Sequence, residues 1–435
     1  MTDRRVLTLT AATVTVVANM VGTGAFTTTG FMAQNGAGGG DILLAWMLGG
    51  LIALCGALCY GEVGANLPHS GGEYYYLSRL IHPSLGFMSG TVSVVVGFAG
   101  PIAASAMLMN SYVATVIPHW PVRAMAAVLV IALALLHSRD VHIGSRFQTI
   151  ITVTKVLLII GFIGAVFIAF PKGDHGDLLK LNAGFLVSSP FAVVLVLVAF
   201  AYAGWNAAAY IGTELKDPQR TLPRSLILGT AIVTILYILL NLSYLLAVPA
   251  QKLSGIEEVG YTVASTLWGA RTGGIVSMLI ALTLLCPISS MLMVGPRIAE
   301  AMARDGFLPT WLSQLNHRNV PARAISLQAG IATLIAITLD FNTLLIYIGF
   351  TLNIFAALTV LTLFRLRRER RSRIKVCIGY PIPPLIFLVF TIWMTVWSIR
   401  EAPEAALYGA ITLASGYILY LFRAKQARLA IDTVD

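Results

Sequence analysis

The chain has 435 residues, of which 57% are hydrophobic and 11% charged, and its mean hydropathy is +0.82. This composition excludes a water-soluble domain and predicts an all-α protein that crosses a membrane many times. The net charge of +10 does not indicate nucleic-acid binding, because the basic residues concentrate in short loops on one side of the predicted spans.

Apolar segments predict twelve transmembrane helices and leave no extramembrane domain. The spans run roughly over 6–33, 41–65, 85–117, 122–137, 146–170, 189–213, 222–248, 272–295, 323–339, 341–364, 381–398 and 405–422. We expect a single transmembrane domain over 1–435. Its two five-helix halves lie at roughly 6–170 and 189–364, and two further helices lie at 381–422. Because each half has an odd number of spans, the second half is inverted relative to the first.

The lysines and arginines predict the orientation in the membrane. With the N-terminus inside, 22 of the 29 fall in inner segments, 6 fall in outer segments, and Lys155 falls in neither. We therefore expect a multi-pass protein of the cell (inner) membrane with both termini in the cytoplasm.

Two predicted spans are interrupted near their middle. The first contains Val21-Gly22-Thr23-Gly24, and glycine is a poor helix former. An unwound turn in hydrocarbon leaves backbone N–H and C=O groups unpaired, which is tolerated only where the turn lines a cavity. A close-packed glycine pair is the alternative. The sixth span repeats the pattern at Ala203-Gly204-Trp205-Asn206, and matching breaks in inverted halves favour a transporter's central binding site.

Five motifs occur in order along nearly the whole chain. They are Gly22-Thr23-Gly24-Ala25-Phe26; Tyr60-Gly61-Glu62 with Gly71-Gly72-Glu73-Tyr74; Phe200 to Asn206 followed by Glu214-Leu215-Lys216-Asp217-Pro218; Arg297 with Ala301 to Gly306; and Lys375-Val376 with Gly379-Tyr380-Pro381. Together they resemble the amino acid–polyamine–organocation (APC) transporter superfamily, and within it the L-type amino acid transporter branch. The resemblance implies a LeuT-like 5+5 inverted repeat with discontinuous helices 1 and 6. Departures at Ala25, Ala203 and Cys286-Pro287 affect the expected shape of the pocket.

A helix broken at mid-membrane offers partners for both charges of an amino acid. The N–H groups of Thr23, Gly24 and Ala25 attract a carboxylate, and the Thr23 hydroxyl is a further donor. The carbonyls of Met20 and Val21 are acceptors for an ammonium group. The resemblance places the carbonyls of Phe200 and Ala201 around the same amine. The predicted site therefore needs no charged side chain at either break.

The other predicted substrate-binding residues are Gly22, Tyr202, Gly204, Trp205 and Asn206. The resemblance places Trp205 over the substrate side chain as part of a thin gate. Tyr202 is equally well interpreted as a packed aromatic residue. Asn206 either touches substrate or holds the unwound turn.

Lys155, Glu62 and Glu214 are ionisable residues in or beside predicted spans. Lys155 lies near mid-membrane, where ionisable residues are usually functional. The resemblance implies that Lys155 takes the place of a coupling sodium ion and either carries a proton or braces helix 1. The alternative is that its side chain snorkels to the membrane surface. Glu62 and Glu214, at inner helix ends, are expected to bind loop N–H groups or arginines.

The predicted function is sodium-independent transport of neutral L-amino acids by alternating access, through exchange or proton coupling. The alternatives are a carrier of cationic amino acids or polyamines, which would need an acidic group or several carbonyls in the distal pocket, and a membrane receptor. No catalytic signature occurs, and Cys55, Cys59, Cys286 and Cys377 lack metal-ligand spacing. We therefore expect no enzyme activity, cofactor, metal or nucleic-acid partner. The sequence identifies no partner subunit.

Overall fold

The computed structural model describes residues 7–69, 71–139, 142–169, 178, 180–316 and 320–432. Within these ranges the chain forms helices and no β-strand, apart from one isolated β-bridge between Leu7 and Leu215. The predicted all-α class is therefore confirmed. Val6 and Phe170, at the edges of predicted spans, lie outside the described residues.

Each of the twelve predicted spans coincides with helix. In chain order they are α1 (Leu9–Met20) with α2 (Gly24–Gln34), α3 (Gly39–Asn66), α5 (Pro83–Val92) with η1 (Ser93–Ala99) and α6 (Gly100–Ala114), α7 (Val122–His137), α8 (His142–Ile168), α10 (Ser189–Tyr202) with η3 (Ala207–Glu214), α11 (Pro218–Ala247), α14 (Ala270–Arg304), α15 (Ala322–Thr338), α16 (Phe341–Arg368), α17 (Ile382–Glu401) and α18 (Pro403–Asp432). In the described part of the chain, nine of these segments are long and apolar enough to cross a membrane. Three are shorter, namely α7, α15 and residues 152–168 of α8, so the count of twelve crossings stays a prediction.

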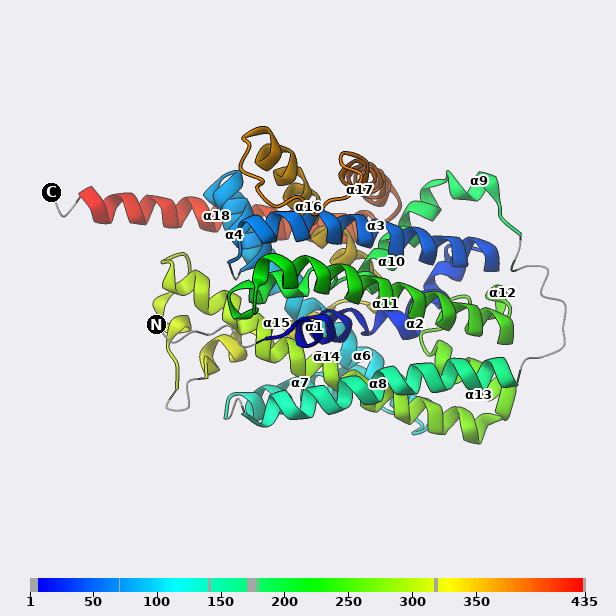
Figure 1. Ribbon diagram of the computed structural model, residues 1–435. Helices are drawn as coiled ribbons and strands as arrows, with labels where there is room; N and C mark the ends of the chain where they lie inside the picture. Colours follow the sequence, from blue (N-terminus) through cyan, green and yellow to red (C-terminus); the bar gives the residue numbers. More distant parts are fainter. Residues whose placement is uncertain are drawn as a thin grey trace.

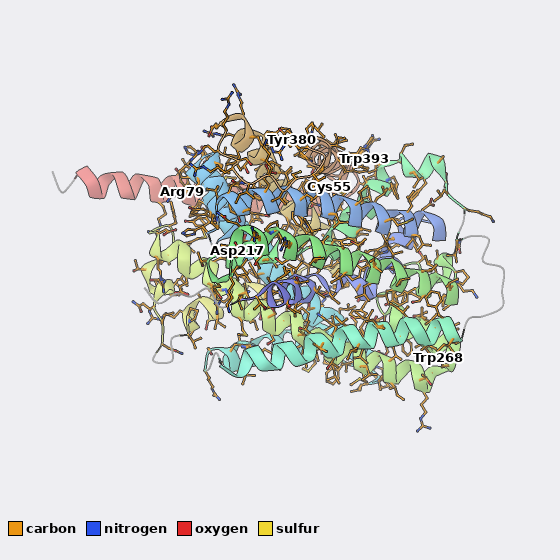
Figure 2. The ribbon with its side chains drawn as sticks, in the orientation of Figure 1. Cys55, Arg79, Asp217, Trp268, Tyr380 and Trp393 are labelled. Carbon is orange, nitrogen blue, oxygen red and sulfur yellow. The ribbon has the colours of Figure 1, made fainter. Side chains whose placement is uncertain are left out.

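The long helices lie side by side along one direction, and the short connecting helices gather at the two ends of this bundle (Figure 1). Helix α4 (Gly72–Leu80) lies at one end, whereas α9 (Ala183–Leu186), α12 (Ala250–Leu253) and α13 (Val259–Trp268) lie at the other. Arg79 and Asp217, from predicted inner loops, lie toward the α4 end, and Trp268, from a predicted outer loop, lies toward the opposite end (Figure 2). The two ends thus contain the segments that the sequence assigns to opposite sides of the membrane.

Apolar side chains occupy both the interior and the outer surface of the bundle. Trp46, Tyr202 and Tyr237 are almost completely buried at its centre. Leu157 and Val389 each remain 62% exposed on its outside. Large exposed apolar side chains along the length of the helices are stable in hydrocarbon and not in water. The fold is therefore that of a multi-pass membrane protein.

The two interrupted spans are joined to each other at the α4 end of the bundle. The Leu7 N–H group donates to the carbonyl of Glu214, and the Lys216 N–H group donates to the carbonyl of Leu7, both at 2.9 Å. The Arg297 guanidinium lies 3.9 Å from the carboxylate of Glu214. The start of α1 and the end of η3 are therefore held together by main-chain hydrogen bonds.

Candidate substrate-binding site

Both predicted helix breaks are present in the structure. Helix α1 ends at Met20 and α2 begins at Gly24, with three non-helical residues between them. Helix α10 ends at Tyr202, and a turn over 203–206 leads into the 3-10 helix η3. Gly204 in this turn has a φ of +98°, a conformation that residues with a side chain rarely adopt.

Glycines bring the two breaks into direct contact. A Cβ atom added at Gly24 would lie 2.5 Å from Cα of Ala201, and one added at Gly204 would lie 2.9 Å from the carbonyl of Asn19. Each break is thus packed against the backbone of the other helix. The close-packing interpretation and the binding-site interpretation therefore both describe these glycines, because a cavity begins directly beside them.

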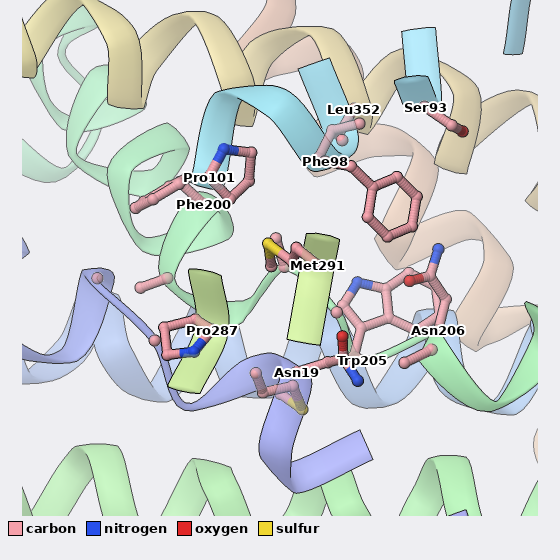
Figure 3. A pocket seen from close by; sticks show the side chains of 18 of the residues that line it. Asn19, Ser93, Phe98, Pro101, Phe200, Trp205, Asn206, Pro287, Met291 and Leu352 are labelled. Atoms are coloured by element: carbon pink, nitrogen blue, oxygen red, sulfur yellow. The ribbon is translucent and has the colours of Figure 1, made fainter. Parts of the chain in front are cut away.

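A cavity of about 140 Å³ lies where the two breaks meet α6, α14 and α16 (Figure 3). Nine of the predicted substrate-binding residues line it: Met20, Gly22, Thr23, Gly24, Phe200, Ala201, Gly204, Trp205 and Asn206. Three predicted residues, Val21, Ala25 and Tyr202, do not line it. Its remaining wall is largely apolar. It includes Pro287, which belongs to one of the departures from the family motifs, and Phe98, Pro101, Met291 and Leu352, which the sequence did not indicate.

The start of α2 forms one polar wall of the cavity. The first N–H groups of a helix have no intrahelical acceptor and carry a partial positive charge. The Thr23 hydroxyl forms a hydrogen bond of 2.7 Å with the hydroxyl of Ser105 on α6, and both residues line the cavity. This wall can bind an anionic group through neutral donors. Ser105 was not predicted, because nothing in its local sequence distinguishes it from a packing serine.

The carbonyls beside the breaks are already hydrogen-bonded within the protein. The Tyr237 hydroxyl on α11 donates to the carbonyl of Met20 at 2.6 Å and to that of Ala201 at 3.2 Å. The Ala203 N–H group donates to the carbonyl of Phe200 at 3.0 Å. Since a carbonyl oxygen has two lone pairs, each can accept one further donor. Tyr237 therefore joins the two breaks, a role that the sequence did not predict.

The three polar or aromatic residues around the second break have different surroundings. Tyr202 is buried against Trp46 and donates its hydroxyl to the Trp46 carbonyl at 3.0 Å, so it packs away from the cavity. Trp205 lines the cavity and contacts Tyr60 edge to face, with ring centroids 4.7 Å apart. The Asn206 side chain lies beside Trp205 (Figure 3). Its amide donates to Glu73 at 2.9 Å and it also lines the cavity, so both interpretations of Asn206 stay predictions.

Lys155 does not reach the surface of the protein. Its side chain is 0% exposed, and its ammonium group contacts the carbonyl of Val21 and lies 3.5 Å from that of Ala18. The snorkelling alternative is therefore wrong. The contact is the one expected for a residue that braces helix 1, because the ammonium group pairs with carbonyls at the end of α1.

Glu62 and Glu214 bind the groups that the sequence predicted. The Glu62 carboxylate, which is fully buried, accepts two hydrogen bonds of 2.6 Å from Arg367 and one of 2.9 Å each from the N–H groups of Val376 and Cys377. Glu214 pairs with Arg297. Both carboxylates thus hold loops and lie outside the cavity lining.

Among the described residues, no group of three or more histidine, cysteine, aspartate or glutamate side chains has an arrangement that could hold a metal ion. The cavity is lined by main-chain groups, hydroxyls, apolar side chains and the amides of Asn19, Asn206 and Asn353. Among the described residues that line it, Glu73 is the only one with a carboxylate. This arrangement suits the binding of a small zwitterion with an uncharged side chain.

Comparison with known proteins also indicates an amino acid transporter. A family model described as "Amino acid permease" matches residues 6–422. The mouse (Mus musculus) large neutral amino acids transporter small subunit 2 is 29% identical over 397 residues, which cover 88% of this chain and 75% of the relative. The mouse Asc-type amino acid transporter 1 is 26% identical over 95% of this chain and 80% of its own length. The human (Homo sapiens) b(0,+)-type amino acid transporter 1 is 27% identical over 93% of this chain and 85% of its own length.

Proposed function

The chain belongs to the amino acid permease family and is an APC-superfamily transporter close to the L-type branch, and on that premise we propose that it exchanges neutral L-amino acids across the cell membrane without sodium. The observation that carries the proposal is the cavity between two broken helices, which offers a helix N-terminus and free carbonyl lone pairs. Alternating access then requires the broken spans to move relative to α3, α6 and α16.

The substrate carboxylate binds at the N–H groups that begin α2, assisted by the hydroxyls of Thr23 and Ser105. The ammonium group binds at the carbonyls of Met20 and Ala201, where Tyr237 fixes the orientation of both acceptors. The substrate side chain lies against Phe98, Met291 and Trp205. Since these walls are apolar, they favour neutral side chains over charged ones.

Sodium independence follows from the place that Lys155 occupies. Its ammonium group is fully buried and pairs with the carbonyls of Ala18 and Val21, directly behind the first break. A cation is thus already supplied by the chain at this position. The protein consequently needs no bound metal ion there to pair with the carbonyls that end α1.

The same proposal places both termini in the cytoplasm. The predicted inner segments contain most of the arginines, and Glu62, Arg367 and the loop that they hold belong to that group of segments. The b(0,+)-type relative motivates one alternative, a carrier that also takes cationic amino acids, because Glu73 supplies a carboxyl group in the cavity.

The test is counterflow of labelled amino acids by the purified protein in proteoliposomes. We expect accumulation of label against excess unlabelled neutral amino acid, without sodium. A receptor would bind label without accumulating it, and a carrier of cations would accumulate labelled arginine or lysine instead. Either result would refute the proposal.

A matched pair of variants tests the carboxylate position. Thr23→Val removes the hydroxyl that lines the cavity, and we expect it to raise the half-saturating concentration about 10-fold, since a hydrogen bond to a charged group is worth about 1.5 kcal/mol or more. Thr27→Val is the control. Thr27 lies one turn further along α2, does not line the cavity, and has a buried hydroxyl without a hydrogen-bond partner among the described residues.

A further inference from the structure

A carboxyl group that the binding of a zwitterion does not require lies in the cavity. Glu73 stands in the first turn of α4, the helix that connects the second and third spans, and its side chain lines the cavity. Among the described residues that line the cavity, it is the only one with a carboxylate or a cationic group. The binding of a neutral amino acid therefore does not explain why Glu73 lies in the cavity.

Two glycines bring Glu73 to this position. Gly71 and Gly72 have φ angles of +115° and +53°, which reverse the chain directly before α4. A Cβ atom added at Gly72 would lie 2.8 Å from the ring of Tyr210 on η3. The start of α4 can thus approach η3 closely only because residue 72 has no side chain.

The Glu73 carboxylate joins an unbroken helix to the second break. The Tyr60 hydroxyl on α3 donates to Oε1 at 2.7 Å, and the Asn206 amide donates to the same oxygen at 2.9 Å. Ser89 of α5 has a buried hydroxyl near the carboxyl group, and this hydroxyl has no hydrogen-bond partner among the described residues. Glu73 therefore determines where the Asn206 side chain lies in the cavity.

Among the described residues, no cationic group acts on the Glu73 carboxylate. The side chain is 4% exposed, and the titratable groups around it are the phenols of Tyr60 from α3, Tyr76 from α4 and Tyr210 from η3. Helices α5, η1 and α16 contribute hydroxyls (Ser89, Ser93 and Thr359), and His69 stacks on Tyr75 instead. Burial raises the pKa of Glu73 to about 7, although the hydrogen bonds from Tyr60 and Asn206 act to lower it.

We propose that Glu73 is a positioning residue that binds a proton during transport: the ionised carboxylate holds the Asn206 amide against α3, and protonation of a carboxylate oxygen releases it. Hydrogen bonds to an ionised acceptor are about twice as strong as those to a neutral one. A proton taken up at Glu73 thus loosens the second break from the unbroken helix. The inference rests on the proposed transport function and adds the proton as a ligand of the same cavity.

The experiment is uptake of a labelled neutral amino acid into proteoliposomes, with equal pH inside and outside, from pH 5.5 to 8.5 without sodium. A group with a pKa of about 7 goes from roughly nine-tenths protonated at pH 6 to roughly one-tenth at pH 8. We expect the wild-type rate to change across this range. Glu73→Gln, which mimics the protonated carboxyl group, should give a pH-independent rate equal to the wild-type rate at acidic pH.

Two further variants keep the test decisive. Tyr60→Phe removes one donor to the ionised form and should move the midpoint of the wild-type profile upward by about one pH unit. This variant decides the question if Glu73→Gln does not fold. Glu369→Gln is the control, because Glu369 pairs with exposed arginines outside the cavity.

A wild-type pH profile in Glu73→Gln, or an unmoved midpoint in Tyr60→Phe, would overturn the inference while leaving the transport function intact. Loss of cationic amino acid uptake in Glu73→Gln, with the pH profile of neutral uptake unchanged, would also overturn it and assign Glu73 to substrate binding. Failure of the wild-type protein to carry any amino acid at any pH would overturn both proposals together.

Discussion

Gly24→Ala tests whether the contact between the two breaks sets the shape of the binding site. The added methyl group would lie 2.5 Å from both Cα and Cβ of Ala201. Since carbon atoms pack at about 3.5–4.0 Å, the start of α2 and the end of α10 must separate by about 1 Å. Such overpacking costs about 1–3 kcal/mol, and the better helix propensity of alanine recovers up to about 1 kcal/mol.

The stability of Gly24→Ala should therefore fall by no more than about 2 kcal/mol, whereas its transport should fall far more. Displacements of about 1 Å at a positioned site can cost roughly 100-fold in rate. The measurements are the initial rate of counterflow and the midpoint of thermal unfolding in detergent. Gly330→Ala on α15 is the control, because an added Cβ there meets no atom within 4 Å. Transport by Gly24→Ala at the wild-type rate would refute the reasoning.

Three further predictions concern buried charges. Lys155→Ala leaves the Val21 carbonyl without its donor, at a cost of roughly 1–3 kcal/mol in stability. We therefore expect sodium-free uptake to fall at least about 10-fold. Unchanged uptake across pH would exclude a role for this lysine. Glu62→Gln breaks a buried pair with Arg367 and should lower the unfolding free energy by about 3–5 kcal/mol, measured by denaturant or thermal unfolding. Glu369→Gln, which breaks more exposed pairs, is the control and should change it far less. Burial raises the pKa of Glu257, in the connection between α12 and α13 outside the spans. The stability of the folded protein is therefore lost as pH rises from the ordinary carboxyl range through the raised pKa. Glu257→Gln removes this ionisation, so it should raise the unfolding temperature at pH 8 and not at pH 4. An equal change at both pH values would contradict this explanation.

The sequence predicted the features that depend on local composition. Each apolar run that predicted a span coincides with helix. The glycines at 22, 24 and 204 predicted both breaks, because a helix in hydrocarbon can unwind only where small residues and a cavity permit it. The position of Glu62 at an inner helix end predicted a loop-holding role, although its partner Arg367 lies 305 residues away in the chain.

Local composition could not predict contacts between segments that are distant in the sequence. Tyr237 reaches the carbonyl of Met20 across 217 residues of chain, and Ser105 reaches Thr23 across 82. Lys155 was predicted to have a role near mid-membrane, but the sequence did not identify the two carbonyls that it contacts at the end of α1, 134 and 137 residues away. Glu73 was visible within a motif, but its place in the cavity depends on how closely α4 approaches η3.

The β-bridge at Leu7 has a practical consequence for work with the protein. Leu7, which precedes α1, forms both hydrogen bonds with residues 214 and 216 at the end of η3 through peptide groups, so replacing the side chains at 7 or 215 leaves these bonds in place. Deleting the chain through residue 7 removes both at once and frees the segment that carries Asn206. A shortened N-terminus, or a bulky affinity tag fused to it, is therefore expected to alter the second break, although the N-terminus belongs to the span that contains the first break.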